Sequence, residues 1–318
     1  MAFEELIPIL EAIEAEIGLH LKARTSLTKE VSEYILKSGG KKLRPLLFVL
    51  SARLCGVDDG EEIRLSPIFE YLHVATLLHD DVIDGAHLRR GKPAANVIWG
   101  NTIPILVGDF LLASALELAA SSGNLKMVQI LSETTSCLAQ GEIHEITRNN
   151  TLDLSEEEYY EIITGKTAVL IAAATRLGAV LANADEEKEM ALKEYGLRLG
   201  TAFQIVDDVL DYIGSEKELG KPVGHDLLEG KVTLPLIYAL KESIDKERKQ
   251  IKKYFSRRQK EDIAAIVSFV KEKKGTEQAL AKAKDLIHQA KEVLLAFPDR
   301  PAKKFLLDIA DFVVERRH

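Results

Sequence analysis

The sequence predicts an all-α fold. Apolar residues recur every three or four positions through much of the chain, as between Leu6 and Ile17 and between Ile263 and Val270. No segment alternates apolar and polar residues for long enough to form a sheet. Gly and Pro, 20 and 9 in number, gather in a few short stretches. We therefore expect long helices separated by few loops.

Start and stop signals place these helices along the chain. Ser155 and Glu158 form a capping box, and Asp185 stands where an N-cap is expected. Gly275 follows a lysine-rich segment at a position typical of a helix C-cap. The expected helices are residues 3–22, 27–37, 42–55, 61–84, 102–121, 125–148, 156–164, 167–182, 186–212, 232–242, 246–254, 259–273, 277–296 and 301–317.

A single domain, residues 1–318, is expected. The chain has 318 residues, which exceeds the roughly 100–200 residues of a usual domain. Its sequence nevertheless contains no Ser/Gly-rich linker, and its only internal echo is a pair of short aspartate clusters. One large helical domain therefore explains the sequence better than two domains.

Composition argues against several classes of protein. With 46% hydrophobic and 29% charged residues, the chain is typical of a soluble globular protein. Its net charge of −8 argues against a nucleic-acid partner, because such partners need a concentrated basic face. Cys55 and Cys137 stand in apolar helical context. They are too few for a disulfide framework, and we expect both to be buried free thiols.

Neither export nor membrane insertion is expected. Glu4 and Glu5 occupy the positions where a signal peptide would be basic. The longest apolar stretches, residues 102–120 and 167–184, are interrupted by charged residues such as Asp109. We interpret both stretches as buried core helices. The expectation is a cytoplasmic protein without an integral membrane span.

Two aspartate clusters carry the clearest chemical signal. Each has two adjacent aspartates and a third three residues later, so the first and last stack on one helix face. Crowded carboxylates repel one another unless a cation lies between them. Mg²⁺ takes one or two carboxylates per ion and completes its shell with water and phosphate oxygens. Two facing clusters would clamp a diphosphate through several Mg²⁺ ions. The candidate metal ligands are Asp80, Asp81, Asp84, Asp207, Asp208 and Asp211.

Two rival motifs fail on position. An EF-hand loop beginning at Asp80 would have Val82 at its third position and Gly91 at its twelfth, where a bidentate carboxylate is needed. A P-loop ending at Gly165-Lys166-Thr167 would need a glycine in place of Tyr160 and a strand before it. The sequence therefore contains neither an EF-hand loop nor a P-loop at these positions.

Cationic side chains near turns complete the candidate site. One group stands in the turn and helix start at residues 39–45, where backbone N–H groups also face an anion. Two arginines follow the first aspartate cluster by a short loop, and two lysines lie in the Gly-rich stretch after the second cluster. A histidine precedes the first cluster by two helical turns on the same face. These residues are Lys41, Arg44, His73, Arg89, Arg90, Lys221 and Lys231.

Taken in order, these motifs resemble the trans-isoprenyl diphosphate synthases, or polyprenyl synthetases. The similarity runs from Gly39 to about Pro235, is highly specific, and shows no departure in the catalytic set. It rests on Gly39-Gly40-Lys41-Lys42-Leu43-Arg44-Pro45, Leu78-His79-Asp80-Asp81-Val82-Ile83-Asp84, Arg89-Arg90-Gly91-Lys92-Pro93, Gly108-Asp109, Gly165-Lys166-Thr167-Ala168, Phe203-Gln204 with residues 207–211, Gly220-Lys221-Pro222, and residues 224–231.

The resemblance implies a fold and a reaction. The fold is a bundle of antiparallel helices around a deep central cavity (the isoprenoid synthase type), usually in a homodimer. The reaction is a Mg²⁺-dependent, head-to-tail condensation of isopentenyl diphosphate onto an allylic diphosphate through a carbocation. Fixed charges and Mg²⁺ stabilise the leaving diphosphate, and apolar helices keep water from the cation. The local sequence is most similar to octaprenyl-type long-chain synthases, with geranylgeranyl diphosphate as the alternative product.

The resemblance also implies roles for individual residues. Asp80, Asp84 and Asp207 would be the principal Mg²⁺ ligands, with Asp81, Asp208 and Asp211 assisting directly or through water. Arg89, Lys166, Lys221 and Lys231 would hold the allylic diphosphate, and Lys41, Arg44, His73 and Arg90 would hold isopentenyl diphosphate. Thr167 and Gln204 would stabilise the carbocation with their oxygens.

Product length is expected to depend on the residues before Asp80, since the growing chain must run alongside this helix. In the family, bulky aromatic residues four and five positions earlier stop growth at short products, whereas this chain has Ala75 and Thr76. The alternative is that these two small residues merely permit close helix packing. Deeper candidates for the floor of the tunnel are Leu72, Phe69 and Ile68, with Cys137 and Leu138 on a facing wall.

Two other classes of protein stay open at this point. A terpene cyclase or a head-to-head synthase would also be helical with Asp-rich clusters. Neither needs a separate isopentenyl diphosphate site, so Lys41, Arg44 and His73 argue against both. A non-catalytic subunit of a heteromeric synthase typically lacks one or both clusters, and both are complete here.

Overall fold

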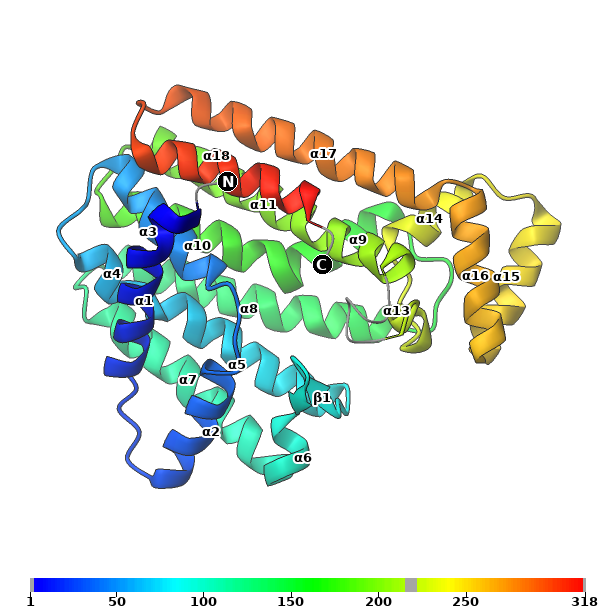
Figure 1. Ribbon diagram of the computed structural model, residues 1–318, viewed down its shortest axis with the longest axis horizontal. Helices are drawn as coiled ribbons and strands as arrows, with labels where there is room; N and C mark the ends of the chain where they lie inside the picture. Colours follow the sequence, from blue (N-terminus) through cyan, green and yellow to red (C-terminus); the bar gives the residue numbers. More distant parts are fainter. Residues whose placement is uncertain (1–2, 215–221, 317–318) are drawn as a thin grey trace. The chain divides into compact units, whose positions relative to one another are not determined.

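The computed structural model describes residues 3–214 and 222–316, and these are almost entirely helical (Figure 1). The long helices fall close to their expected positions. The elements are η1 (Phe3–Leu6), α1 (Ile7–Leu19), α2 (Ser26–Leu36), α3 (Leu43–Cys55), α4 (Glu61–Leu65), α5 (Pro67–Ile83), β1 (Leu88–Arg89), β2 (Lys92–Pro93), α6 (Ala95–Trp99), α7 (Thr102–Ala120), α8 (Leu125–Arg148), α9 (Glu156–Ile163), η2 (Thr164–Ala168), α10 (Val169–Leu181), α11 (Glu186–Ile213), α13 (His225–Leu228), α14 (Leu234–Lys241), α15 (Asp245–Arg257), α16 (Lys260–Glu272), α17 (Gly275–Val293), η3 (Leu294–Ala296) and α18 (Pro301–Glu315).

The chain forms two compact units, each assembled from three segments. The first unit comprises Met1–Thr135, Ala173–Lys193 and Phe297–Leu306. The second comprises Ser136–Ala172, Glu194–Ala296 and Leu307–His318. That the whole chain acts as one domain stays a prediction.

The first unit is organised around α5. This helix packs along α7 and against α3, and the rings of Phe69 and Phe48 lie 4.9 Å apart in the core between α5 and α3. Tyr71 is fully buried and donates its hydroxyl to the carbonyl of Ile17 at 2.6 Å. The expected single helix 61–84 is split at Ser66, because Pro67 has no N–H to continue the α4 ladder and instead begins α5.

The second unit contains the helical segments that line a cavity. The capping box at Ser155 and Glu158 is present and starts α9. The prediction for Gly275 is wrong: Lys274 takes the left-handed conformation, and Gly275 is the first residue of α17. Glycine is needed there for packing, since a Cβ would lie 2.1 Å from the carbonyl oxygen of Pro235 at the contact of α14 with α17.

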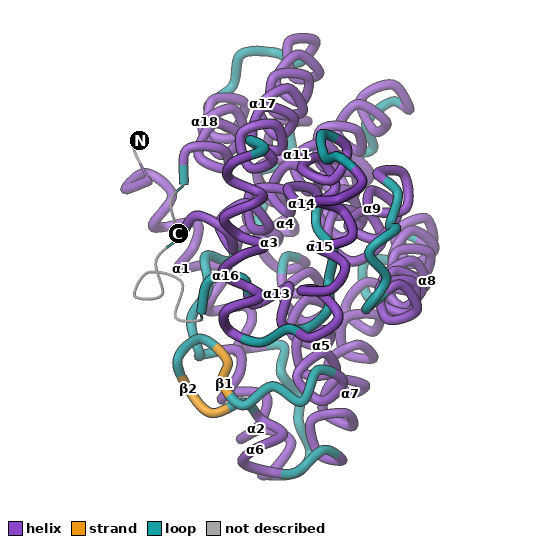
Figure 2. The backbone as a smooth tube through the Cα atoms, turned by 90° about the vertical axis from the view of Figure 1, so that its right-hand side faces the viewer, coloured by secondary structure: helices purple, strands orange, loops and turns teal. Residues whose placement is uncertain are grey.

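A short antiparallel hairpin joins α5 to α6, and the sequence analysis missed it (Figure 2). Leu88 pairs with Pro93 and Arg89 with Lys92, and the two turn residues, Arg90 and Gly91, both have positive φ. Such a two-residue turn suits the twist of paired strands. The hairpin fixes the direction in which the two arginines leave the end of α5.

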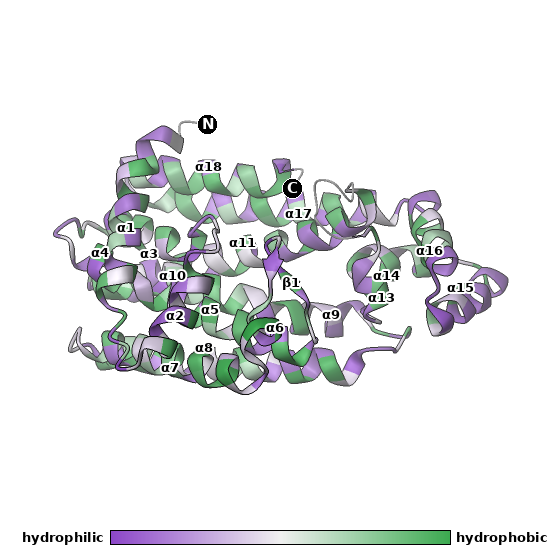
Figure 3. Ribbon diagram, turned by 60° about the horizontal axis from the view of Figure 1, so that its bottom comes forward, coloured by the Kyte–Doolittle hydropathy of each residue, from purple (hydrophilic) through white to green (hydrophobic). Residues whose placement is uncertain are grey.

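Two helical stretches are long and apolar enough to meet the criteria for a membrane span. Glu156–Leu181 is 67% buried, as expected of a core helix, whereas Thr102–Ala120 is only 39% buried. The expectation that residues 102–120 form a buried core helix is therefore wrong. Helix α7 is largely hydrophobic (Figure 3), and apolar side chains such as Leu106 are exposed. The expectation for the cysteines also needs correction: Cys55 is half-buried and Cys137 is exposed, and both are free thiols.

A buried ion pair ties α3 to α5. The Lys42 ammonium lies 2.8 Å from Glu70 and also donates to the carbonyl of Leu36 at 3.0 Å. Both charged side chains are almost fully buried. Lys42 therefore points into the first unit, while its neighbour Lys41 is exposed.

We expect Glu70→Ala to destabilise the protein by about 3–5 kcal/mol, because it leaves a buried ammonium without its counter-charge. The matched control is Glu33→Ala, which removes an exposed ion pair with Lys37 worth about 0–1 kcal/mol. Urea unfolding followed by circular dichroism measures both changes. Equal effects of the two substitutions would show that the buried pair contributes no more than a surface pair.

Candidate active site

The first aspartate cluster ends α5. Asp84 is the C-cap residue, and its N–H donates to the carbonyl of Asp80 at 2.8 Å. Asp84 is exposed and Asp80 is half-buried, whereas Asp81 is fully buried. The guanidinium of Arg89 donates to one oxygen of Asp81 from Nε at 2.8 Å and from Nη2 at 2.5 Å. Asp81 thus anchors the hairpin, and its two neighbours are the accessible carboxylates.

A group of cations surrounds His73 in the same unit. Gly39 and Gly40 both have positive φ, and the Arg90 guanidinium packs on Gly40 and donates to the carbonyl of Gly39. Burial lowers the pKa of His73 well below its usual value, and the charges of Arg44, Arg90, Lys42 and Arg89 lower the pKa further. The structure therefore brings Arg44, Arg89 and Arg90 close to a neutral imidazole.

The residues expected to limit product length lie on α5 as predicted. Ala75, Leu72, Phe69 and Ile68 are buried, and the hydroxyl of Thr76 donates to the carbonyl of His73 at 2.8 Å. Phe69 belongs to the core of the first unit through its ring contact with α3. Their role in product length stays a prediction. Cys137 lies in a surface groove of the second unit beside Gly141 and Gly165, and Leu138 is buried.

The second aspartate cluster lies on α11. Asp207 is partly exposed and forms an ion pair with Arg316 at 2.7 Å. The guanidinium of Arg316 in turn lies 3.8 Å from the ring centre of Phe203. Asp208 and Asp211 are buried. As in the first cluster, the second aspartate of the pair is turned inward.

Asp211 caps a short helix. Its two carboxylate oxygens accept the N–H groups of His225 and Asp226, both at 3.2 Å, at the start of α13. This contact fixes the loop that carries Lys231. Lys221, which was also expected to bind diphosphate, lies outside the described residues.

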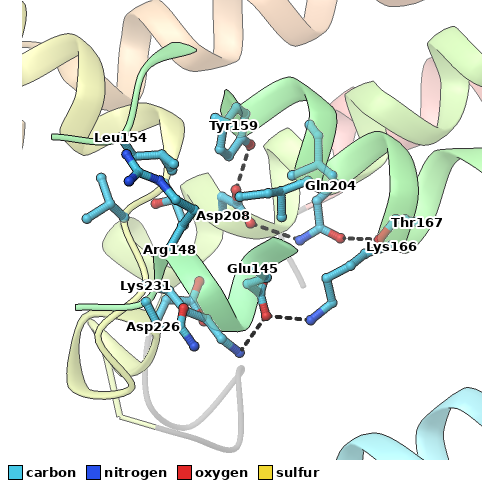
Figure 4. Close-up of a pocket in the computed structure, with 15 residues that line it drawn as sticks. Glu145, Arg148, Leu154, Tyr159, Lys166, Thr167, Gln204, Asp208, Asp226 and Lys231 are labelled. Carbon is cyan, nitrogen blue, oxygen red and sulfur yellow. Dashed lines mark hydrogen bonds and ion pairs between the residues drawn. The ribbon is translucent and has the colours of Figure 1, made fainter. Parts of the chain in front are cut away.

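A cavity of about 220 Å³ opens in the second unit beside Asp208 (Figure 4). Its formation depends on close helix approach. A Cβ at Gly141 of α8 would lie 2.6 Å from the backbone of Gly165, and one at Gly200 of α11 would lie 2.6 Å from Ala168. Between these contacts the chain makes the π-helical turn η2, a distortion often found at functional sites. The cavity is lined by Glu145, Arg148, Asn149, Leu154, Tyr159, Ile162, Ile163, Lys166, Thr167, Gln204, Asp208, Asp226, Lys231, Val232 and Thr233.

Two lysines share a glutamate at the cavity. Lys166 pairs with Glu145 at 2.6 Å, and Lys231 pairs with the same carboxylate at 3.6 Å (Figure 4). Lys166 also pairs with Glu142 at 2.9 Å, and Lys231 with Glu229 at 2.8 Å. Burial opposes the charge of Lys166 most strongly, but Glu145 and Glu142 outweigh it and raise the pKa of Lys166 to about 12. Lys166 is therefore held charged, and Lys231 lines the same cavity within an ion pair with Glu229.

Hydrogen bonds also link the neutral polar residues. Thr167 donates to the Gln204 carbonyl oxygen at 2.9 Å, and the Gln204 amide donates to Asp208 at 2.9 Å. The hydroxyl of Tyr159 donates to the other oxygen of Asp208 at 2.6 Å. Burial raises the pKa of Asp208 well above its usual value, with Asp226 adding to the effect. Burial likewise raises the pKa of Tyr159, and Asp208 raises it further.

Sequence reasoning missed several residues of this site: Glu142, Glu145, Tyr159, Asp226 and Arg316. Glutamates on a helix are usually solvated, and a tyrosine near a cap is usually a core residue, so neither carries a signal alone. A useful sign was available for Glu142 and Glu145. Both follow Gly141, and a glycine inside a helical pattern often marks a close approach of another segment.

The carboxylates suit Mg²⁺ as partial ligands. Asp80, Asp84 and Asp207 keep exposed surface, although Asp207 also pairs with Arg316, whereas Asp81, Asp208 and Asp211 are buried and accept hydrogen bonds from within the protein. In residues 3–214 and 222–316, no three His, Cys, Asp or Glu side chains already converge as a closed metal site.

Exposed or half-buried aspartates thus occur in both units, and the cavity of the second unit is lined by lysines and by uncharged oxygens. The chain belongs to the Polyprenyl synthetase family, whose model matches residues 25–272. It is 36% identical to the octaprenyl diphosphate synthase of Haemophilus influenzae, over 98% of this chain and 95% of that protein. It is 38% identical to a short chain isoprenyl diphosphate synthase of Methanothermobacter thermautotrophicus, over 90% of each chain.

A solved structure extends the similarity to the fold. The polyprenyl synthase from Caulobacter crescentus, complexed with calcium and isoprenyl diphosphate, matches with a TM-score of 0.94 and 39% sequence identity. The match covers 99% of this chain and 97% of that chain. The predicted family and the all-α isoprenoid synthase fold are therefore confirmed.

His73 gives the site a testable pH dependence. Its pKa is lowered in the free protein, and a bound anion would favour the imidazolium and raise that pKa. Binding would then take up a proton, so the affinity for inorganic pyrophosphate should rise as the pH falls from about 7.5 toward 5.5. Calorimetric titration of the wild type and His73→Gln isolates this effect, because the protonation of pyrophosphate itself cancels. The same pH dependence in both proteins would exclude His73 from the anion site.

Proposed function

We propose that this protein elongates an allylic diphosphate with successive isopentenyl diphosphate units and releases a long-chain trans-polyprenyl diphosphate. The observation that carries the proposal is the cavity in the second unit, where two charged lysines lie beside uncharged oxygens. Ionisation of an allylic diphosphate creates an anion and a cation side by side, and this cavity offers a stabilising group for each.

Residues of the second unit would hold the allylic substrate. Lys166, Lys231 and, by the resemblance, Lys221 would donate to its diphosphate. That Arg89, a residue of the first unit, also assists stays a prediction. The oxygens of Thr167 and Gln204 would lie against the allylic carbons and stabilise positive charge there. Ile162, Ile163 and Leu154 line the same cavity and would exclude water from the cation.

Mg²⁺ would be held by Asp80, Asp84 and Asp207, the carboxylates with exposed surface. When bound, it supplies Lewis-acid stabilisation of the leaving diphosphate. The structure of the Caulobacter relative, which contains a divalent cation and isoprenyl diphosphate, supports this use of the fold. Asp81 and Asp211 would support the site through the segments they anchor.

Residues around His73 would hold isopentenyl diphosphate. Arg44 and Arg90 lie close enough to depress the pKa of His73, and Lys41 stands exposed at the adjoining turn. An anion placed there would offset the mutual repulsion of these cations. A second diphosphate site favours chain elongation over a terpene cyclase, which needs only one.

A single incubation tests the reaction against its rivals. The purified chain alone is supplied with isopentenyl diphosphate, farnesyl diphosphate and Mg²⁺, and the products are separated by chromatography. Elongated trans-polyprenyl diphosphates support the proposal. Cyclic hydrocarbons would indicate a cyclase, and no turnover by well-folded protein would indicate a non-catalytic subunit.

We expect Asp80→Asn and Asp207→Asn each to lower kcat at least ~10²-fold, because each removes several kcal/mol of leaving-group stabilisation. The Mg²⁺ concentration for half-maximal activity should also rise. Glu133→Gln, an exposed carboxylate on α8, is the control and should change neither quantity. Normal turnover of Asp80→Asn at saturating Mg²⁺ would refute the assignment.

We also propose a homodimer formed through apolar helix surfaces. Val97, Ile98, Ile105 and Leu106 on α6 and α7 are 40–58% exposed, more apolar surface than a helix in water usually shows (Figure 3). Light scattering should give twice the mass of the chain, and Leu106→Glu should lower it toward the monomer. A monomeric wild type at micromolar concentration would refute the proposal.

A cytoplasmic location stays a prediction.

Product length tests the role of α5. Ala75 and Thr76 leave room that an aromatic side chain would fill, and we propose octaprenyl-like products, with geranylgeranyl diphosphate as the alternative. Ala75→Phe or Thr76→Tyr should shift the main product toward farnesyl diphosphate while the first condensation continues. Ala281→Phe, at an exposed position of α17, is the size-matched control. An unchanged product distribution in both α5 variants would place the limit elsewhere.

A further inference from the structure

Three hydrogen bonds in the cavity run toward one carboxylate. Tyr159 donates to Oδ2 of Asp208 at 2.6 Å, and the Gln204 amide donates to Oδ1 at 2.9 Å. The hydroxyl of Thr167 donates to the carbonyl oxygen of Gln204 at 2.9 Å. Figure 4 shows these residues joined in one row along the cavity.

The acceptor at the end of the row decides the orientation of every other group. An amide can offer either its NH₂ or its oxygen, and Asp208 Oδ1 accepts only from the NH₂. The Gln204 oxygen must then face Thr167, whose proton it receives. The hydroxyl oxygen of Thr167 and the amide oxygen of Gln204 each keep a lone pair that is available to a ligand in the cavity. This direction holds whether or not Oδ2 carries a proton, because Oδ1 still accepts from the amide.

Tyr159 is the group that holds Asp208 in place. It is almost fully buried, and its ring packs edge-on against Tyr160 at 5.6 Å, so its hydroxyl has a fixed position. Loss of that hydroxyl would leave a buried carboxylate oxygen without its donor. The carboxylate could then rotate and release the amide of Gln204.

We propose that Tyr159 is a positioning residue for the reaction: through Asp208 it fixes the Gln204 amide so that oxygen atoms, and not N–H groups, face the allylic cation. Asp208 then serves chiefly as the anchor of this row, and not as a metal ligand. The proposal rests on the proposed function for the identity of the cation.

Tyr159→Phe removes only the hydroxyl and should lower kcat about tenfold, the effect of losing one oriented hydrogen bond in a buried site. The KM for both diphosphates and the Mg²⁺ concentration for half-maximal activity should stay within about twofold, since neither lysine nor exposed aspartate is altered. Tyr160→Phe is the matched control, because it removes the neighbouring hydroxyl, which does not reach Asp208, and should behave as the wild type.

A binding measurement separates orientation from general structural damage. An allylic diphosphate analogue with an ammonium nitrogen at the cationic carbon is compared with its uncharged carbon isostere by calorimetry. Tyr159→Phe should weaken the ammonium analogue at least ~5-fold more than the isostere, because only the charged probe senses the orientation of the oxygens. In a Gln204→Leu background the same substitution should have little further effect, since no amide is left to orient.

Each result decides the proposal. It is overturned if Tyr159→Phe matches Tyr160→Phe, if both probes weaken equally, or if the Mg²⁺ requirement rises, which would make Asp208 a metal ligand. Should Tyr159→Phe fail to fold, Asp208→Asn serves instead. The NH₂ group of the new asparagine can donate to the Gln204 oxygen, so the Gln204 amide can rotate by 180°. A variant that keeps the full preference for the ammonium analogue would overturn the proposal. An inactive wild type would instead refute the proposed function.

Discussion

Buried carboxylates that need hydrogen-bond donors are the constraint on which the rest of the site depends. Asp81, Asp208 and Asp211 are all buried, and an unpaired carboxylate in such surroundings would cost several kcal/mol. Each takes its donors from a different segment: the hairpin after α5, helix α9 with α11, and the start of α13. The loops that carry the basic residues are held where they are because the carboxylates require them. Acidic clusters thus organise the cationic part of the site.

The same logic explains how an acidic protein maintains a site for anions. Lys166 and Lys231 are both half-buried, where an unpaired charge would be unfavourable, and Glu145 pairs with both of them. The first unit follows another strategy, in which cations gather around a histidine that stays neutral. The lysines stay charged because they are paired with glutamates, whereas repulsion around His73 is limited because the imidazole stays unprotonated. A net charge of −8 therefore says little about what binds locally.

Sequence reasoning predicted most of the helices and the family, because periodicity and motif spacing are local properties, whereas the role of the six aspartates stays a prediction. It could not tell that Asp81 and Asp208 turn inward while Asp80 and Asp207 keep exposed surface, since that division depends on which segment packs against each face. Arg89 meets Asp81 only because a hairpin reverses the chain, and a two-residue strand leaves no periodic trace. Gly275 shows the opposite error: a glycine explained by backbone conformation was needed for its small volume.

The π-helical turn at Thr164–Ala168 has a consequence for how this protein can change. A π turn holds one more residue than an α turn, and deleting it would rotate the following helix by about 100°. Lys166 and Thr167 lie inside the turn, so the helix cannot be made regular without separating the two groups from the cavity. Substitutions that favour regular α-helix here would raise stability at the cost of the site. The π-helical turn thus costs helix stability, and that cost is tied to the placement of Lys166 and Thr167 at the cavity.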